Sequence, residues 1–451
     1  MIEYQHYRLA FILPQRRQLL GLANLNSIEL PLITIPKWQR PAEQLTRLIA
    51  TKWKLDSIVL DVFADTPNSL PCAMIEVRTP TWDFSSDGFK AVHPDQVSND
   101  HLSDEERQTI VSILAGKDDT RDPFSQLGWI DEAQEWIRDE VKDKDLRFTE
   151  RFLQLGAGQR SALIRFGRGQ GPDYWLKATG HRHSREFRVT TTLAALFPNH
   201  LPPLVAKHEA WSAWVMEDAG ASLDDCFSLP ALERAVIALA ELQQRSLGYL
   251  DTLRDAGVVD SSIAVLQKDL GSLFEYLEEA MAIQTSHKVA PLMPKNLTDL
   301  NGVLHSACCM MEDLRIPCSL VHGDINLGNI VMNASHCAFI DWAEAGIGNP
   351  FLTFHQLLAH MVRVDPATEA WTARLEHLYK AQWRDRLTGS QIDRALTVAP
   401  LLTVLSCLHS GGSWLNSPRR NDPNVQGYAR SLARRMDRVA RAPELTEALC
   451  Q

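Results

Sequence analysis

An aspartate, an asparagine and a second aspartate stand at spacings that suit phosphoryl transfer. Asp324 and Asn329 are five positions apart within residues 322–329, and Asp341 follows Asn329 by twelve positions. Phosphoryl transfer needs positioning and charge neutralisation more than covalent chemistry. Asp324 can accept the proton of an acceptor hydroxyl. The oxygens of Asn329 and Asp341 are hard ligands of the kind that Mg²⁺ prefers.

The residues between these groups predict a hairpin. Residues 330–332 and 338–340 are apolar, and the turn-forming residues 333–335 separate them. Such a hairpin returns Asp341 to the side of Asn329. Asp and Asn also favour turns through local hydrogen bonds, which is the structural alternative. The order of a histidine, two acids and flanking strands favours the catalytic interpretation.

The pattern His322-Gly323-Asp324, then Asn329, then Ile340-Asp341-Trp342 resembles the catalytic loop of the aminoglycoside phosphotransferase and choline kinase-like families. These families share the protein-kinase-like fold and the pattern H-G-D-x4-N followed by I-D-W or I-D-F. The resemblance covers about residues 150–450. It implies that Asp324 is the catalytic base, that Asn329 and Asp341 bind Mg²⁺, and that ATP is the phosphoryl donor. We expect His322 to orient the loop through its ring nitrogens.

A kinase-like fold also needs a loop that covers the nucleotide phosphates. Residues 152–166 supply a strand-loop-strand pattern with Gly156 and Gly158 in the loop. Glycine lets backbone N–H groups approach a phosphate closely. Two glycines in an ordinary hairpin turn are the alternative interpretation.

A lysine and a glutamate follow in the order that the kinase plan requires. Lys177 lies in the short strand pattern 174–178, and Ser184 is a plausible N-cap for a helix that ends near Phe197. Glu186 lies on the apolar face of that helix, where an unpaired carboxylate is costly. We therefore predict a Lys177–Glu186 pair that places the ammonium near the α and β phosphates. A surface lysine on an edge strand is the alternative.

Residues 211–220 resemble the last strand of the small lobe and the hinge that follows it. Backbone groups at Met216, Glu217 and Asp218 are expected to face the adenine. The chain after Asp341 is predicted to be almost wholly helical.

Three further features of the carboxy-terminal part leave alternatives open. A helix is predicted from about Thr298 to Leu314, with Thr298 as its N-cap. Glu344, three positions after Asp341, either tunes the metal site, contacts the substrate or has a structural role. An arginine run near the carboxy terminus is typical of a solvated face, with a phosphate or polyanion site as the alternative. The run comprises Arg430, Arg434, Arg435, Arg438 and Arg441.

The first 120 or so residues are not explained by the kinase-like pattern and are enough for a separate domain. They read as strands at 7–13, 18–22, 57–63 and 72–77, with a helix at 42–53. This order weakly resembles a Nudix-like α/β fold, but no R-E-x-x-E-E metal cluster is present. A binding, regulatory or interaction module is therefore expected. Residues 128–142 read as an amphipathic linker helix.

Composition limits the class of protein. The chain has 451 residues, 45% apolar and 23% charged, which suits a globular protein of two or three domains. Its net charge of −10 disfavours nucleic-acid binding. No apolar run approaches the ~20 residues that cross a bilayer, so no membrane role is expected. The eight cysteines lack CxxC spacing and the amino terminus lacks a signal-peptide pattern, so we expect a cytoplasmic location.

These observations predict an α+β protein with a two-lobed protein-kinase-like fold and an extra amino-terminal α/β domain. The predicted parts are an accessory domain at 1–122, a linker helix at 123–150, an N-lobe at 151–220 and a helical C-lobe at 221–451. The expected activity is transfer of the ATP γ-phosphoryl to a hydroxyl of a small molecule. The alternatives are a nucleotide-binding regulatory protein with weak or no catalysis, and a kinase acting on protein side chains. The amino-terminal domain is expected to make regulatory or oligomeric contacts.

Overall fold

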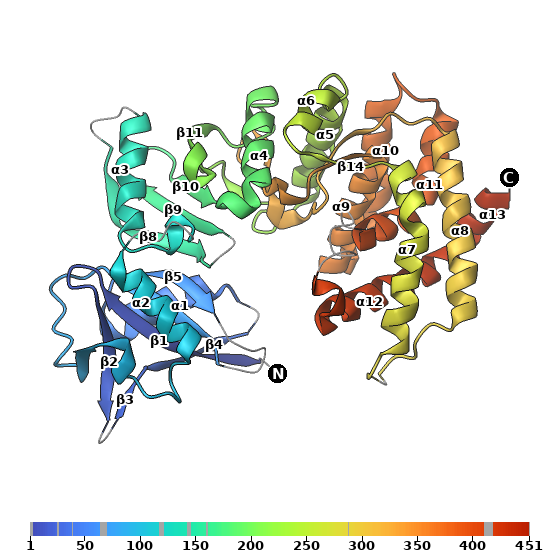
Figure 1. Cartoon of the computed structure of the whole chain (residues 1–451). Coiled ribbons are helices and arrows are strands. Elements are labelled where there is room, and N and C mark those ends of the chain that lie inside the picture. Colours follow the sequence, from blue (N-terminus) through green and yellow to red (C-terminus); the bar gives the residue numbers. More distant parts are fainter. Residues whose placement is uncertain are drawn as a thin grey trace. The chain divides into compact units, whose positions relative to one another are not determined.

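The computed structural model describes residues 3–24, 27–37, 39–63, 70–116, 121–141, 146–158, 161–286, 288–409 and 418–450. The chain divides into two compact units, which are described separately (Figure 1). The first unit comprises residues 1–187 and 203–218, and the second comprises 188–202 and 219–451. The predicted α+β class is confirmed, because the amino-terminal part is rich in sheet and the carboxy-terminal part is mostly helical.

A seven-stranded mixed sheet occupies the amino-terminal part of the first unit. Its main path is β3-β2-β1-β6-β5, while β4 pairs with β1 and β7 pairs with β2. Strands β1 and β6 are central, parallel and almost wholly buried, which fits their apolar sequences. The strands are β1 (Tyr4–Leu13), β2 (Gln18–Asn24), β3 (Ser27–Glu29), β4 (Leu32–Pro36), β5 (Ser57–Phe63), β6 (Cys72–Val77) and β7 (Phe89–Val92).

Two helices pack against this sheet. Helix α1 (Pro41–Trp53) is the predicted helix, and it buries Leu45 and Ile49 in a core with Phe11. Helix α2 (Asp104–Ala115) begins at a capping box that the sequence analysis missed. In it, the Ser103 hydroxyl accepts from the Glu106 N–H, and the Glu106 carboxylate accepts from the Ser103 N–H.

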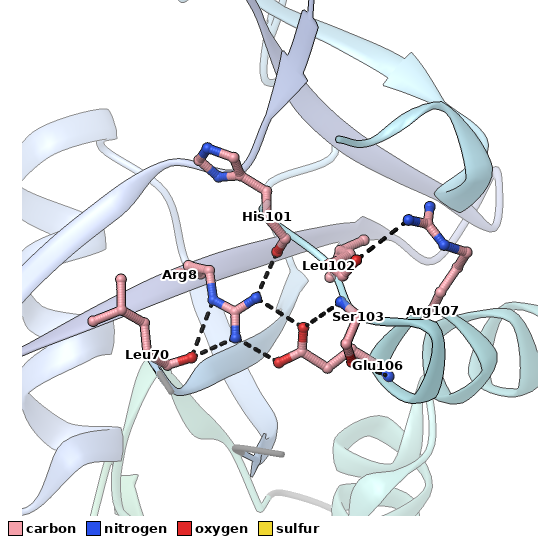
Figure 2. Close-up of polar contacts among 7 residues, drawn as sticks. All are labelled: Arg8, Leu70, His101, Leu102, Ser103, Glu106 and Arg107. Atoms are coloured by element: carbon pink, nitrogen blue, oxygen red, sulfur yellow. Dashed lines mark hydrogen bonds and ion pairs between the residues drawn. The ribbon is translucent and has the colours of Figure 1, made fainter. Parts of the chain in front are cut away.

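The same carboxylate forms a buried ion pair with Arg8 of β1 (Figure 2). The guanidinium donates to both oxygens of Glu106, with N···O distances of 2.8 and 2.5 Å. It also donates to the carbonyls of His101 and Leu70, at 2.6 and 3.1 Å. Arg8 and Glu106 are 7% and 0% exposed, so this pair joins α2 to the centre of the sheet inside the protein.

A second, five-stranded sheet follows in the first unit, in the order β11-β12-β10-β9-β8. Helix α3 (Trp129–Val141), which is the predicted linker helix, packs beside it and buries Trp129, Ile130 and Ile137. These residues share one apolar core with Ile164 and Phe166 of the sheet. The strands are β8 (Phe148–Gly156), β9 (Ala162–Arg168), β10 (Tyr174–Ala178), β11 (Leu204–His208) and β12 (Ala213–Glu217).

One side chain links the two sheets. Gln154 of β8 is 2% exposed, and its amide pairs with the backbone of Val59 in β5. The Val59 N–H donates to Gln154 Oε1 and Gln154 Nε2 donates to the Val59 carbonyl, each at 2.8 Å. The pairing lies where the register of β5 against β6 shifts, between Val59 and Asp61. Gln154 therefore replaces a backbone partner at this irregularity.

The second unit is built mainly of helices (Figure 1). Its helices are α5 (Leu229–Ser246), α6 (Leu250–Asp255), α7 (Ile263–Ala282), α8 (Pro294–Asp313), α9 (Pro350–Val364), α10 (Thr372–Trp383), α11 (Gly389–His409), α12 (Pro423–Ala440) and α13 (Pro443–Cys450). The prediction that α8 begins at Thr298 is wrong, because Pro294 starts the helix in the position that proline favours. The Thr298 hydroxyl donates to the Pro294 carbonyl at 3.1 Å within the first turn.

Helix α11 is long and apolar enough to cross a membrane by length and composition alone. It is the single such helix in the part of the chain that the structure describes. Its apolar residues, including Leu401, Leu405 and Leu408, belong to the core of the second unit, and a buried core helix meets the same criterion.

Six short strands form two small sheets in the second unit, in the orders β13-β16-β17 and β14-β18-β15. They are β13 (Ala221–Ser222), β14 (Val259–Ser261), β15 (Ser319–Val321), β16 (Ile330–Met332), β17 (Cys337–Phe339) and β18 (Gly346–Gly348). Strand β15 leads directly into the catalytic-loop sequence, and β16 and β17 follow it. The predicted domain boundaries and the Nudix-like character of residues 1–122 stay predictions.

Candidate active site

The predicted hairpin after Asn329 is present and has the expected consequence. Strands β16 and β17 pair antiparallel, with Ile330 opposite Phe339. One residue further, the Ile340 N–H donates to the Asn329 carbonyl at 3.0 Å. This bond holds the start of the Ile340-Asp341 segment against Asn329, so the two predicted metal ligands lie on neighbouring strand ends.

Asparagine side chains fix the loop that carries Asp324. Asn329 Nδ2 donates to the Asp324 carbonyl at 2.9 Å, and Asn326 Nδ2 donates to the same carbonyl at 3.1 Å. Asn326 also caps a single 3₁₀ turn, Leu327–Asn329, by accepting from the Asn329 N–H. Because the Asn329 amide nitrogen is bonded to the loop, its Oδ1 atom is the one directed away as a possible ligand.

His322 lies below this loop and is 1% exposed. Its Nε2 donates to the Ile340 carbonyl at 2.8 Å, so this nitrogen carries a proton. The ring packs against Trp342, with centroids 4.5 Å apart, and Trp342 Nε1 donates to the Phe339 carbonyl at 3.0 Å. His322 thus joins the start of the loop to the segment that leads to Asp341, which agrees with the orienting role expected for it.

Gly323 is a position that only glycine fits. Its φ is 80°, and a Cβ atom here would lie 2.1 Å from the Glu344 carbonyl oxygen. The loop therefore packs directly against the turn after Asp341. The sequence analysis assigned Gly323 no role, although the residue stands inside the motif.

Two carboxyl groups of like charge influence one another in this loop. Burial, and secondarily the charge of Asp341, raises the pKa of the Asp324 carboxyl above its usual value. Hydrogen bonding from Asn326 and Asn329 and the charge of Arg363 oppose the shift. Asp341 itself has a left-handed backbone, with φ 66°, which is costly for a residue with a side chain and is common at functional sites.

The donor set fits a magnesium ion that also binds phosphates. Mg²⁺ in such sites uses one or two protein carboxylates, with phosphate oxygens and water completing the shell. Asp341 and the Oδ1 atom of Asn329 would supply two hard oxygen ligands. Among the described residues there is no group of three or more His, Cys, Asp or Glu side chains that forms a complete protein cage.

In the first unit, the predicted lysine and glutamate are in contact. Lys177 Nζ of β10 donates to Glu186 Oε1 of α4 (Ser184–Leu196) at 2.5 Å, and the side chains are 15% and 10% exposed. The Lys177 ammonium also lies over the ring of Trp214, 5.8 Å from its centroid. The pair is therefore held in a defined, nearly buried position, as the kinase plan requires.

The remaining predicted nucleotide contacts lie in the same sheet. Gly156 ends β8, and Gly158 has a φ of 129°, which favours glycine; Gln159 and Arg160 lie outside the described residues. Met216 and Glu217 end β12, where the Glu217 N–H donates to the Pro203 carbonyl.

Asp218 follows β12 and has several partners in the first unit. Its N–H donates to the Asp173 carbonyl at 2.8 Å. Its carboxylate accepts from Trp175 Nε1 at 3.2 Å and contacts the Arg165 guanidinium at the same distance. The side chain of Asp218 therefore stabilises the end of the sheet, and the predicted adenine contacts at Met216, Glu217 and Asp218 stay predictions.

A loop of this geometry, with a buried histidine, a partly exposed aspartate and an asparagine–aspartate pair, is typical of phosphotransferases. Residues 185–389 match the model of the phosphotransferase enzyme family, APH. This match confirms the family resemblance that the catalytic-loop motif predicted. It also confirms the predicted class of enzyme, a phosphotransferase with an alcohol group as acceptor. No curated protein sequence matches the chain.

Solved structures of kinases resemble the chain remotely. A choline/ethanolamine kinase family protein from Mesorhizobium loti is 14% identical, with 71% of this chain and 98% of that chain covered and a TM-score of 0.48. An ethanolamine kinase from Plasmodium vivax is 14% identical, with 77% and 97% covered and a TM-score of 0.47. A GDP and kanamycin complex of an APH(2″) enzyme is 16% identical, with 69% and 99% covered and a TM-score of 0.45. These similarities are too remote to indicate a substrate.

Proposed function

We propose that this protein transfers the γ-phosphoryl group of ATP to a hydroxyl of a small molecule. In this proposal Asp324 is the general base, and Asn329 and Asp341 hold the magnesium ion that accompanies the nucleotide. Lys177, positioned by Glu186, binds the α and β phosphates. Gly156 and Gly158 lie in the loop that covers the phosphates, and the end of β12 contacts the adenine. A cytoplasmic location suits ATP as the donor.

The proposed step is an in-line displacement. The acceptor hydroxyl gives its proton to the Asp324 carboxylate while its oxygen forms a bond to the γ-phosphorus. The bond between the γ-phosphorus and the β,γ-bridging oxygen breaks, and ADP leaves with that oxygen. When bound, magnesium would neutralise charge on the phosphate oxygens. The protein residues position the reactants, move one proton and counter the remaining charge.

The gathering of Asp324, Asn329 and Asp341 carries this proposal. Two hydrogen bonds produce it: Asn329 Nδ2 to the Asp324 carbonyl, at 2.9 Å, and the Ile340 N–H to the Asn329 carbonyl, at 3.0 Å. A loop with a purely structural purpose would not need a base with a raised pKa next to a second carboxylate. The same groups are the ones that phosphoryl transfer requires at neighbouring positions.

The test is ADP release by the purified full-length chain with ATP, Mg²⁺ and pooled hydroxyl compounds. Transfer by the wild type that is lost in Asp324→Ala, with nucleotide binding retained, would support the assignment. The exposed Asp385→Ala is a matched control, since it removes the same charge from the second unit. Full ATP-dependent phosphorylation by Asp324→Ala would contradict the catalytic assignment.

A nucleotide-binding regulatory protein is the alternative function. The large amino-terminal part of the first unit, which has no catalytic assignment, favours it. Tight ATP–Mg²⁺ binding without transfer to any acceptor would support this alternative over the kinase. Regulatory or oligomeric contacts through residues 1–122 are part of either proposal.

A further inference from the structure

The side of Asp324 that faces helices α9, α11 and α12 carries positive charge. On α9, Thr353, Gln356, His360 and Arg363 stand at offsets of three, seven and ten, so they share one helical face. Gln356 Nε2 donates to the Gly323 carbonyl at 3.2 Å, next to the proposed base. This bond places that face of α9 directly beside the catalytic loop, within the second unit.

A small pocket opens at this point. It has a volume of about 20 Å³, enough for one water-sized group, so it forms the floor of a site. Its polar lining is neutral, and among the described residues that line it none carries a carboxylate. The polar lining residues are Ser261, Asn349, Thr353, Gln356, Thr403 and Ser406. Hydroxyl and amide groups of this kind suit a hydroxylated ligand.

Two arginines lie above this floor. Arg363 is held by its neighbour on α9, since its Nη2 contacts His360 Nδ1 at 2.6 Å. The pKa of the Tyr428 hydroxyl on α12 is raised, chiefly by burial, and the charges of Arg363 and Arg435 oppose that shift. The Asp324 charge acts on the same hydroxyl, so both arginines and the base lie near Tyr428.

Neither arginine forms an ion pair with a carboxylate in the described part of the chain. Burial and the charge of Arg435 lower the pKa of His355 to about 4, so this histidine is neutral and adds no charge at pH 7. The carboxylates that act on this region are Asp341, the proposed metal ligand, and Asp224, which acts on His360. Two arginines without carboxylate partners next to a neutral polar floor are suited to an anion.

We propose that the acceptor is a small hydroxylated anion, whose carboxylate or phosphate is bound by Arg363 and Arg435 while its hydroxyl faces Asp324. This inference depends on the proposed kinase function and specifies its substrate class. A cationic acceptor would need carboxylates or an aromatic cage where the arginines stand. Arg435 belongs to the run that the sequence analysis favoured as a solvated face.

The first experiment compares acceptors by ADP release with the full-length enzyme. The anionic probes are gluconate, glycerate, glycerol 3-phosphate and ribose 5-phosphate; choline, ethanolamine and kanamycin are the cationic probes, and glycerol and ribose are neutral. We expect transfer to at least one anionic probe in preference to its neutral counterpart. Carboxylate and phosphate probes distinguish the two sources of the charge. Preference for a cationic or neutral probe would overturn the inference and leave the kinase function intact.

Substitutions then test the two arginines. Arg363→Gln and Arg435→Gln should each raise the KM for the anionic acceptor by about tenfold to a hundredfold, the usual range for loss of a charge-assisted contact. The KM for ATP should not change, and Arg435→Lys should restore part of the acceptor affinity. Arg394→Gln is the matched control, because Arg394 is an exposed arginine in the first turn of α11. Equal KM values for all four proteins would overturn the assignment.

If no compound is phosphorylated, the kinase function fails and binding decides the inference. Calorimetric titration with gluconate and with glycerol 3-phosphate, in the presence of ADP and Mg²⁺, gives the needed readout. Binding by the wild type and by Arg394→Gln that is lost in Arg363→Gln or Arg435→Gln supports an anion site. Absence of binding to the wild type contradicts it.

Discussion

The protein contains two clusters of charged side chains that differ in how their charge is balanced. Around Arg8, a buried carboxylate from α2 meets a guanidinium that donates to both of its oxygens and to two backbone carbonyls (Figure 2). Around Asp324, the second carboxylate, Asp341, adds like charge and raises the pKa of the first. The Arg8 cluster is complete within the protein, whereas the Asp324 cluster becomes electrostatically favourable when a cation and phosphates bind.

The difference separates stability from function. A buried ion pair with satisfied hydrogen bonds is costly to break, because one charge is left without a partner. Two carboxylates near one another cost stability and supply a base and a metal ligand instead. We therefore expect substitutions in the Arg8 cluster to change folding, and substitutions in the Asp324 cluster to change catalysis.

The largest effect is expected at the base. Asp324→Asn should lower kcat by about a thousandfold, or about 4 kcal/mol in the activation barrier, since proton transfer to the carboxylate is lost. The free energy of unfolding should be equal to or greater than that of the wild type, because the like charge beside Asp341 is removed. Steady-state kinetics and urea denaturation measure the two effects. A variant that lost stability instead would remove the contrast with Arg8.

The next effect is the reverse at Glu106. Glu106→Gln should lower the free energy of unfolding by about 3 kcal/mol, because Arg8 keeps its charge inside the protein without a counter-ion. The kcat of the folded enzyme should not change. Arg8→Met and the double variant Arg8→Met/Glu106→Gln complete a double-mutant cycle, in which the double variant should be more stable than Glu106→Gln alone. An additive double variant would show that the two residues do not interact.

Lys177 should show a smaller effect of mixed character. Lys177→Met should raise the KM for ATP by about tenfold, since one charge-assisted phosphate contact is lost. It should also reduce stability, because Glu186, which is 8% exposed, loses its cationic partner. The exposed Lys207→Met in the same sheet is the matched control. An unchanged KM for ATP would contradict the nucleotide role of Lys177.

The smallest effect concerns pH. The raised pKa of Asp324 means that the unfolded state releases its proton first as the pH rises above the usual value of 3.8. The carboxyl therefore lowers stability as pH increases through that window, and the loss is complete above the folded-state pKa. The stabilisation of Asp324→Asn over the wild type should be present at pH 7 and decrease toward pH 4. In the active enzyme, kcat/KM should rise over the same window as the base ionises.

Short-range patterns made part of this architecture predictable. The β16–β17 hairpin follows from apolar segments around a turn, and the contact of Lys177 with Glu186 follows from their order on a strand and the next helix. Arg8 and Glu106 are 98 positions apart, and their contact depends on how α2 returns to the sheet. Arg363 and Arg435 were equally hidden, since a helical arginine has the same sequence pattern whether it faces solvent or a site.

Gln154 limits how the protein can be divided for experiments. A fragment that began at residue 151 would carry β8 without Val59, so the Gln154 amide would lose both of its backbone partners. The same fragment would expose Ile164 and Phe166, which pack with Ile130 of α3. We expect such a truncated protein to aggregate when expressed alone. The amino-terminal residues therefore act as an integral half of the sheet region, and studies of catalysis need the entire polypeptide.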